Sequence, residues 1–105
     1  MAQITFRNDA NLPDGDVEIL TQLADEFLEK LGKKIEIMRS EVRIKEAKNQ
    51  GGMPTMFEVL LEVFLTHGGT FVAEAENKEL KPALQEAINE VDHQFQAKHD
   101  RERRH

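Results

Sequence analysis

The sequence contains no cysteine, tryptophan or tyrosine, and it has only three prolines. The lack of cysteine excludes disulfide bonds, thiolate metal sites and cysteine nucleophiles. No apolar run approaches the roughly 20 residues that a membrane-spanning helix needs, and the segment from Met1 to Ile4 lacks the basic start and apolar stretch of a signal peptide. We therefore expect a soluble, cytoplasmic protein that does not enter a membrane.

A chain of 105 residues suits one domain with a single hydrophobic core. The periodic apolar pattern ends at about Lys98, and the residues that follow are polar and largely basic. We therefore predict one domain over residues 1–98 and a basic, frayed tail over residues 99–105.

The net charge of −6 hides an uneven distribution. Residues 33–48 carry six cationic and three acidic side chains, and residues 98–105 carry four and two. The rest of the chain is strongly acidic. Lysine and arginine side chains are the ones that bind phosphate groups, so the negative overall charge argues against nucleic acid as a partner. The two basic segments, taken alone, favour nucleic-acid binding.

Hydrophobic periodicity divides the chain into four strands and two helices. Apolar residues at every second position predict strands over residues 3–8, 35–47, 56–66 and 70–76. Apolar residues three and four positions apart predict helices over residues 16–31 and 79–98. The apolar parity of the second strand changes near Met38, which indicates a bulge or a bend.

The predicted order is strand, helix, strand, strand, strand, helix. Two amphipathic helices can cover one face of a four-stranded sheet, so we predict an α+β, two-layer sandwich with the other sheet face open. The strand over residues 56–66 is apolar on both sides, which is typical of a central strand.

The residues that could carry catalysis do not form a recognisable site. The four histidines are scattered without metal-ligand spacing, so we predict no metal site. Glu74 and Glu76 point the same way from one strand, as a general acid and base would. Nothing in the sequence gives them different environments, and a solvated sheet edge explains them better. We predict no enzymatic activity and no cofactor.

Three apolar residues are expected on the open sheet face: Leu60, Phe64 and Val72. A contiguous apolar patch there would mark a homodimer or protein-partner surface. The simpler interpretation is the ordinary exposure of apolar atoms that every protein surface shows. The sequence leaves both open.

The second strand places cations at alternate positions, so Arg39, Arg43 and Lys45 share one face. Together with the basic tail they are able to contact successive phosphates of a nucleic-acid backbone, provided that they gather into one continuous stripe. The alternative is a solvated strand whose cations pair across the sheet with Glu58 and Glu62.

The stretch from Gly68 to Lys98 resembles a known family without a gap. The residues concerned are Gly68-Gly69-Thr70, Ala73-Glu74-Ala75, Leu80, Ala83-Leu84-Gln85, Ala87-Ile88, Val91 and Gln94-Phe95, followed by the basic residues from Lys98 to Arg104. In this pattern the chain is similar to the ribosome hibernation-promoting factors, which include ribosome-associated inhibitor A and the light-repressed proteins. The first helix and the segment from Val42 to Asn49 resemble the family more loosely. The chain departs from the family at Glu90 and His93, where lysine or arginine is common.

The resemblance implies a non-enzymatic stress-response protein. Members of this family dock in the tRNA and mRNA channel of the small ribosomal subunit and silence translation under stress or in stationary phase. They bind ribosomal RNA through basic residues on the helices and the sheet. The residues of this chain that the resemblance and the charge pattern single out for RNA binding are Arg39, Arg43, Lys45, Lys48, Lys98, Arg101, Arg103 and Arg104. The rival hypothesis is a protein-binding or dimerising module on the same fold.

Overall fold

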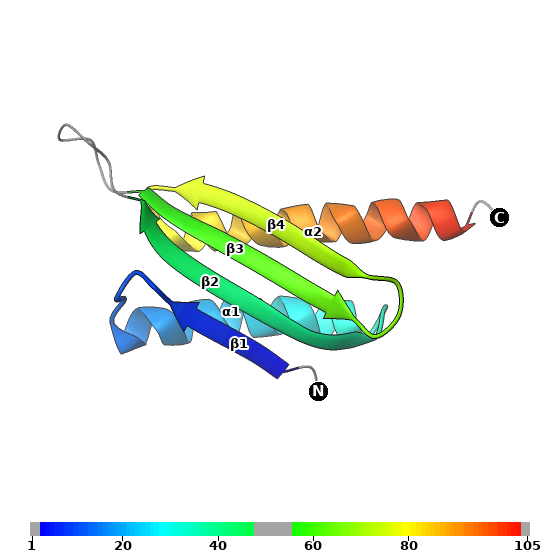
Figure 1. Cartoon of the computed structure of the whole chain (residues 1–105), viewed down its shortest axis with the longest axis horizontal. Helices are drawn as coiled ribbons and strands as arrows, with labels where there is room; N and C mark the ends of the chain where they lie inside the picture. Colours follow the sequence, from blue (N-terminus) through cyan, green and yellow to red (C-terminus); the bar gives the residue numbers. More distant parts are fainter. Residues whose placement is uncertain (1–2, 48–55, 104–105) are drawn as a thin grey trace.

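The computed structural model describes residues 3–47 and 56–103. Its elements are β1 (Gln3–Asn8), α1 (Asp14–Gly32), β2 (Ile37–Ala47), β3 (Met56–Leu65), β4 (Thr70–Asn77) and α2 (Leu80–Arg103). The predicted order of strands and helices is confirmed, as is the two-layer α+β architecture (Figure 1).

The four strands form one mixed sheet in the order β1-β2-β3-β4. β1 and β2 are parallel because α1 carries the chain back between them, whereas the other neighbours are antiparallel. The register aligns Phe6, Val42, Leu61 and Ala73 in one row across the sheet. An irregularity between Ile37 and Arg39 confirms the disruption expected near Met38.

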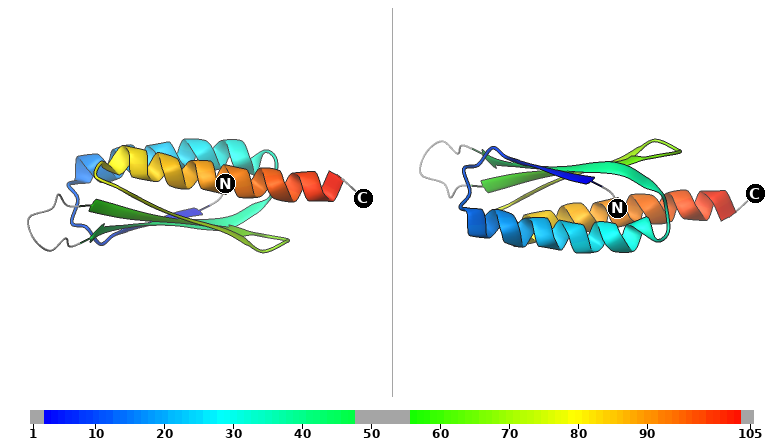
Figure 2. Two further views of the ribbon diagram at one scale, coloured as in Figure 1. Left: turned by 90° about the horizontal axis from the view of Figure 1, so that it is seen from above. Right: turned by 90° about the horizontal axis from the view of Figure 1, so that it is seen from below.

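Both helices lie side by side on one face of the sheet, and they end at the same end of the molecule (Figures 1 and 2). α1 buries Leu20, Ala24, Leu28 and Leu31, whose spacing of three and four residues places them on one side of the helix. These side chains meet the row of buried residues that β2, β3 and β4 present. The opposite face of the sheet is uncovered (Figure 2).

α2 buries an apolar stripe that ends at Phe95: Ala83, Leu84, Ala87, Ile88, Val91 and Phe95. The Phe95 ring meets the Phe71 ring edge to face, with centroids 6.5 Å apart and an interplanar angle of 87°. This contact ties the middle of α2 to β4, and it is a favourable arrangement for two aromatic rings.

α2 continues through Arg103, beyond the end at about Lys98 that the apolar pattern predicted for this helix. No glycine or proline follows Pro82, so nothing in the backbone ends the helix there. The His99 ring also stacks on Phe95, with centroids 5.8 Å apart. The last turns of α2 therefore extend beyond the sheet (Figure 1). In the described part of the chain, neither helix has the length and apolar character needed to cross a membrane.

Candidate nucleic-acid interface

The predicted RNA-binding residues of β2 all lie on the open sheet face. Arg39, Arg43 and Lys45 have the parity opposite to the buried residues Ser40, Val42 and Ile44. β2 runs from the end where the helices stop to the opposite end of the molecule (Figure 1), so Arg39 and Lys45 lie toward opposite ends of the sheet.

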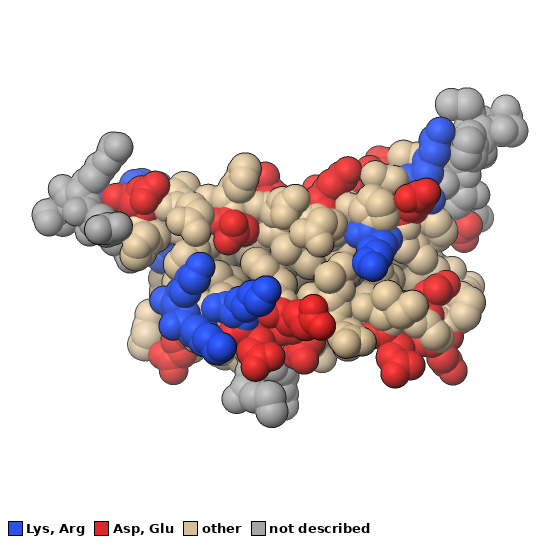
Figure 3. All heavy atoms as spheres, turned by 180° about the vertical axis from the view of Figure 1, so that it is seen from behind, with Lys and Arg blue, Asp and Glu red and all other residues tan. Residues whose placement is uncertain are grey.

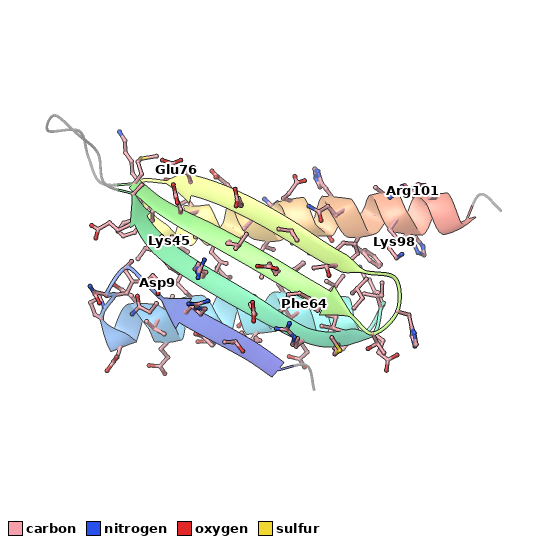
Figure 4. The ribbon with its side chains drawn as sticks, in the orientation of Figure 1. Asp9, Lys45, Phe64, Glu76, Lys98 and Arg101 are labelled. Atoms are coloured by element: carbon pink, nitrogen blue, oxygen red, sulfur yellow. The ribbon has the colours of Figure 1, made fainter. Side chains whose placement is uncertain are left out.

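The other predicted residues belong to α2 or fall outside the described part of the chain. Lys98 and Arg101 lie in the last turns of α2, far along the molecule from Lys45 (Figure 4). Arg103 ends the helix. Lys48 and Arg104 lie outside the described residues.

Both arginines of β2 are engaged by carboxylates. The Arg39 guanidinium lies 2.7 Å from Glu41 and also stacks 3.9 Å above the centre of the Phe64 ring. The Arg43 Nε lies 3.2 Å from an oxygen of Asp9, which follows β1. These partly exposed pairs contribute at most about 1 kcal/mol each to stability, but they reduce the positive field that a phosphate would meet.

Charge on the open face is divided between the two halves of the sheet. The cations come from β1 and β2: Arg7, Arg39, Arg43 and Lys45. The carboxylates of β3 and β4 are Glu58, Glu62, Glu74 and Glu76. Two carboxylates are exceptions: Glu41, which lies between the two arginines of β2, and Asp9, which follows β1 and pairs with Arg43. In the register, Lys45 is opposite Glu58, as the sequence allowed.

A hollow of about 380 Å³ lies at one end of this face. Its walls carry both signs of charge, from Arg43, Lys45, Glu58, Glu74 and Glu76, beside Leu60. Because three of the five charged groups are carboxylates, this hollow is a poor site for a polyanion.

The three apolar residues expected on the open face are found there. Val72 is 45% exposed, and Leu60 and Phe64 are half-buried. Glu62 lies between Leu60 and Phe64 on β3 and is the register partner of Val72. The three apolar side chains therefore surround one carboxylate.

The structure adds cations that the site prediction missed, at the end where both helices stop. Lys30 lies in the last turn of α1, and Lys33 and Lys34 follow it. The Lys34 ammonium is 5.9 Å from the centre of the Phe95 ring. Phe95 precedes Lys98 in α2 by about one helical turn. Lys30, Lys33, Lys34, Lys98 and Arg101 are here called the cationic helix end. Figure 3 shows a group of Lys and Arg atoms toward this end, on the helical side of the molecule, directly beside a group of Asp and Glu atoms.

The described residues do not form the single continuous stripe that the sequence suggested. Glu41 interrupts the β2 cations because it has the same parity along the strand. Lys98 and Arg101 belong to the helical layer, on the other side of the sheet from Lys45 (Figures 2 and 4). The positive charge is therefore divided between the open face and the cationic helix end.

Acidic and histidine side chains are the candidate metal ligands among the described residues. Within residues 3–47 and 56–103, no three of them are grouped as potential ligands. His67, in the β3–β4 turn, approaches Glu36 at 3.9 Å, and both side chains are largely exposed.

Comparison with known proteins gives no family assignment. No protein-family model matches the chain. No curated protein matches it at a significant level.

Proposed function

We propose that the protein binds the small ribosomal subunit and silences translation under stress or in stationary phase, without catalysing a reaction. The proposal is supported by the gap-free resemblance from Gly68 to Lys98 and by the β-α-β-β-β-α order. The observation that carries it is the cationic helix end, where both helices stop toward one end of the molecule and Lys34 after α1 reaches Phe95 of α2.

We place the main RNA contact at the cationic helix end. Asp25, Glu29 and Glu36 line one hollow with Lys33 there and weaken its positive field. On the open face, Arg39 and Arg43 are paired with Glu41 and Asp9, and the neighbouring strands carry glutamates that repel phosphate. At the helix end, Lys33 and Arg101 are exposed and extend from the ends of adjacent helices. Lysines in this position also interact favourably with the negative helix ends, and that role is compatible with phosphate binding.

The test is co-sedimentation of the full chain with purified small ribosomal subunits. We expect binding at about 50 mM salt and much weaker binding at about 200 mM, because phosphate contacts release counterions. The double variant Lys33→Glu/Arg101→Glu should lose affinity by more than about tenfold at low salt.

The matched control is Lys78→Glu/Lys81→Glu, which makes the same charge change with exposed residues at the other end of α2. It should retain most of the affinity. If both double variants lose affinity equally, the loss comes from the change in net charge and not from the cationic helix end. Failure of the unmodified chain to sediment at low salt would overturn the proposal.

A further inference from the structure

The open sheet face has the charge pattern of a self-complementary surface. Among the described residues, the open-face cations all belong to β1 and β2, beside Glu41 and Asp9, and the charged groups of β3 and β4 on this face are all carboxylates. The two halves of the face are therefore largely complementary in charge. The apolar residues Leu60, Phe64 and Val72 lie in the carboxylate half. An isolated face of this kind matches a second copy better than it matches a uniformly charged partner.

We propose that two copies of the chain associate through their open sheet faces about a two-fold axis parallel to the strands. Such an axis between β2 and β3 places β1 and β2 of each copy over β4 and β3 of the other. Each row of residues across the sheet then faces the same row of the second copy. A two-fold axis perpendicular to the strands in the same plane would place each strand over itself, which sets Arg39 against Lys45 on β2 and the apolar Leu60 and Phe64 against glutamates on β3.

The sheet register gives the facing residues in each row. Lys45 is opposite Glu58 within the sheet, so the two-fold axis sets Lys45 against Glu58 of the second copy. Arg7, Arg43, Leu60 and Glu74 form the next row. There, Arg7 meets Glu74 of the second copy, and the aliphatic stem of Arg43 covers Leu60.

The remaining rows supply the apolar centre and one of two unfavourable contacts. The other lies in the row of Lys45, where Asp9, next to Lys45 at the end of β1, is set against Glu76 of the second copy. Arg39 and Phe64 are register partners, so the guanidinium that stacks on Phe64 in one copy also reaches Phe64 of the other. Val72 meets Thr5 of the second copy, since both lie in the row of Glu41 and Glu62. In that row Glu41 faces Glu62 of the second copy, a like-charge contact that weakens the dimer.

The face is large enough for a weak dimer. The four strands have 6, 11, 10 and 8 residues. With about 3.3 Å per residue and about 4.8 Å between neighbouring strands, their backbones cover roughly 550 Å². This value approaches the roughly 800 Å² per partner of a standard interface. We therefore expect a concentration-dependent equilibrium between monomer and dimer.

The dimer leaves the cationic helix end accessible, because that end belongs to the helical layer (Figure 2). Self-association and subunit binding are therefore separable. Lys33→Glu/Arg101→Glu should dimerise like the unmodified chain, so failure of one proposal does not imply failure of the other.

The experiment is analytical ultracentrifugation of the full chain over a wide concentration range, with far-UV circular dichroism to show that each variant is folded. Phe64→Asp should abolish the dimer, and Lys45→Glu should weaken it at least about fivefold by setting glutamate against Glu58 of the second copy. The swap Lys45→Glu/Glu58→Lys should restore it, since each new lysine faces a new glutamate. Glu62→Gln should strengthen the dimer by removing its like-charge contact with Glu41.

Strengthening by Glu62→Gln together with rescue by the swap supports both the surface and its two-fold arrangement. A monomer at every concentration overturns the proposal. A dimer that is insensitive to Phe64→Asp also overturns it, because the association would then use another surface.

Discussion

The side-chain amide of Gln94 forms two hydrogen bonds with the main chain of Val72. Its Oε1 accepts from the Val72 N–H at 3.1 Å, and its Nε2 donates to the Val72 carbonyl at 2.6 Å. β4 is an edge strand, so these main-chain groups would otherwise be available to a strand of another molecule. Gln94 therefore fastens α2 to the sheet and blocks this point of the edge.

Replacing Gln94 by alanine should remove both hydrogen bonds. We expect the free energy of unfolding to fall by about 1–2 kcal/mol, as two partly exposed hydrogen bonds contribute. Aggregation on heating should also increase, because the Val72 main chain becomes available for strand pairing. Urea denaturation and light scattering measure the two effects. Gln96→Ala, an exposed change two residues along α2, is the control and should alter neither quantity.

The buried Phe95 ring connects three parts of the structure. It is 5% exposed and contacts Phe71 and His99, with the Lys34 ammonium near its face. Phe95→Ala should lower the free energy of unfolding by about 3–5 kcal/mol, through lost burial and the cavity that remains. Phe95→Leu should cost clearly less. Thermal or urea unfolding gives the values, and a cost below about 1 kcal/mol for the alanine variant would contradict the packing described for α2.

Gly68 and Gly69 offer a matched pair in the β3–β4 turn. Both have positive φ, at 94° and 100°, so alanine at either position should cost about 1–2 kcal/mol of backbone strain. Only at Gly68 would a new Cβ meet Lys98, whose ammonium would be 2.8 Å away. Gly68→Ala should therefore displace Lys98 and reduce affinity for the small subunit, whereas Gly69→Ala should destabilise the fold without that reduction. Urea unfolding and subunit co-sedimentation separate these outcomes.

Breaking the ion pair between Arg43 and Asp9 tests whether the open sheet face or the cationic helix end is the main RNA contact. Asp9→Asn releases Arg43 from its carboxylate on the open face. Because the cationic helix end is the proposed RNA contact, subunit affinity should change by less than about twofold, and stability should fall by no more than about 1 kcal/mol. A large gain in affinity would instead assign the main RNA contact to the open sheet face.

Local patterns in the sequence predicted the elements and their inward faces. Alternation along β3 placed Leu60 and Phe64 on the open face, and the parity change located the irregularity at Met38. These features depend on neighbours within one strand, where a period of two is directly visible.

Contacts between distant segments were not predictable in the same way. The meeting of Lys34 with Phe95 depends on both helices ending at one end of the molecule. The pairing of Arg43 with Asp9 follows from the parallel register of β1 and β2, which sets the end of β1 beside the middle of β2. The separation of the β2 cations by Glu41 was visible in the parity of the strand, whereas their distance from Lys98 required the arrangement of the two layers.

The most direct test of the proposed function is the salt dependence of affinity for the small ribosomal subunit. If the cationic helix end neutralises phosphates, log Kd should rise linearly with log salt concentration. The slope for Lys33→Glu/Arg101→Glu should be smaller by about 1.4–1.8, since each of the two lost contacts removes roughly 0.7–0.9. Lys78→Glu/Lys81→Glu should keep the original slope. Binding that is independent of salt, or the same slope in all three proteins, would contradict the account.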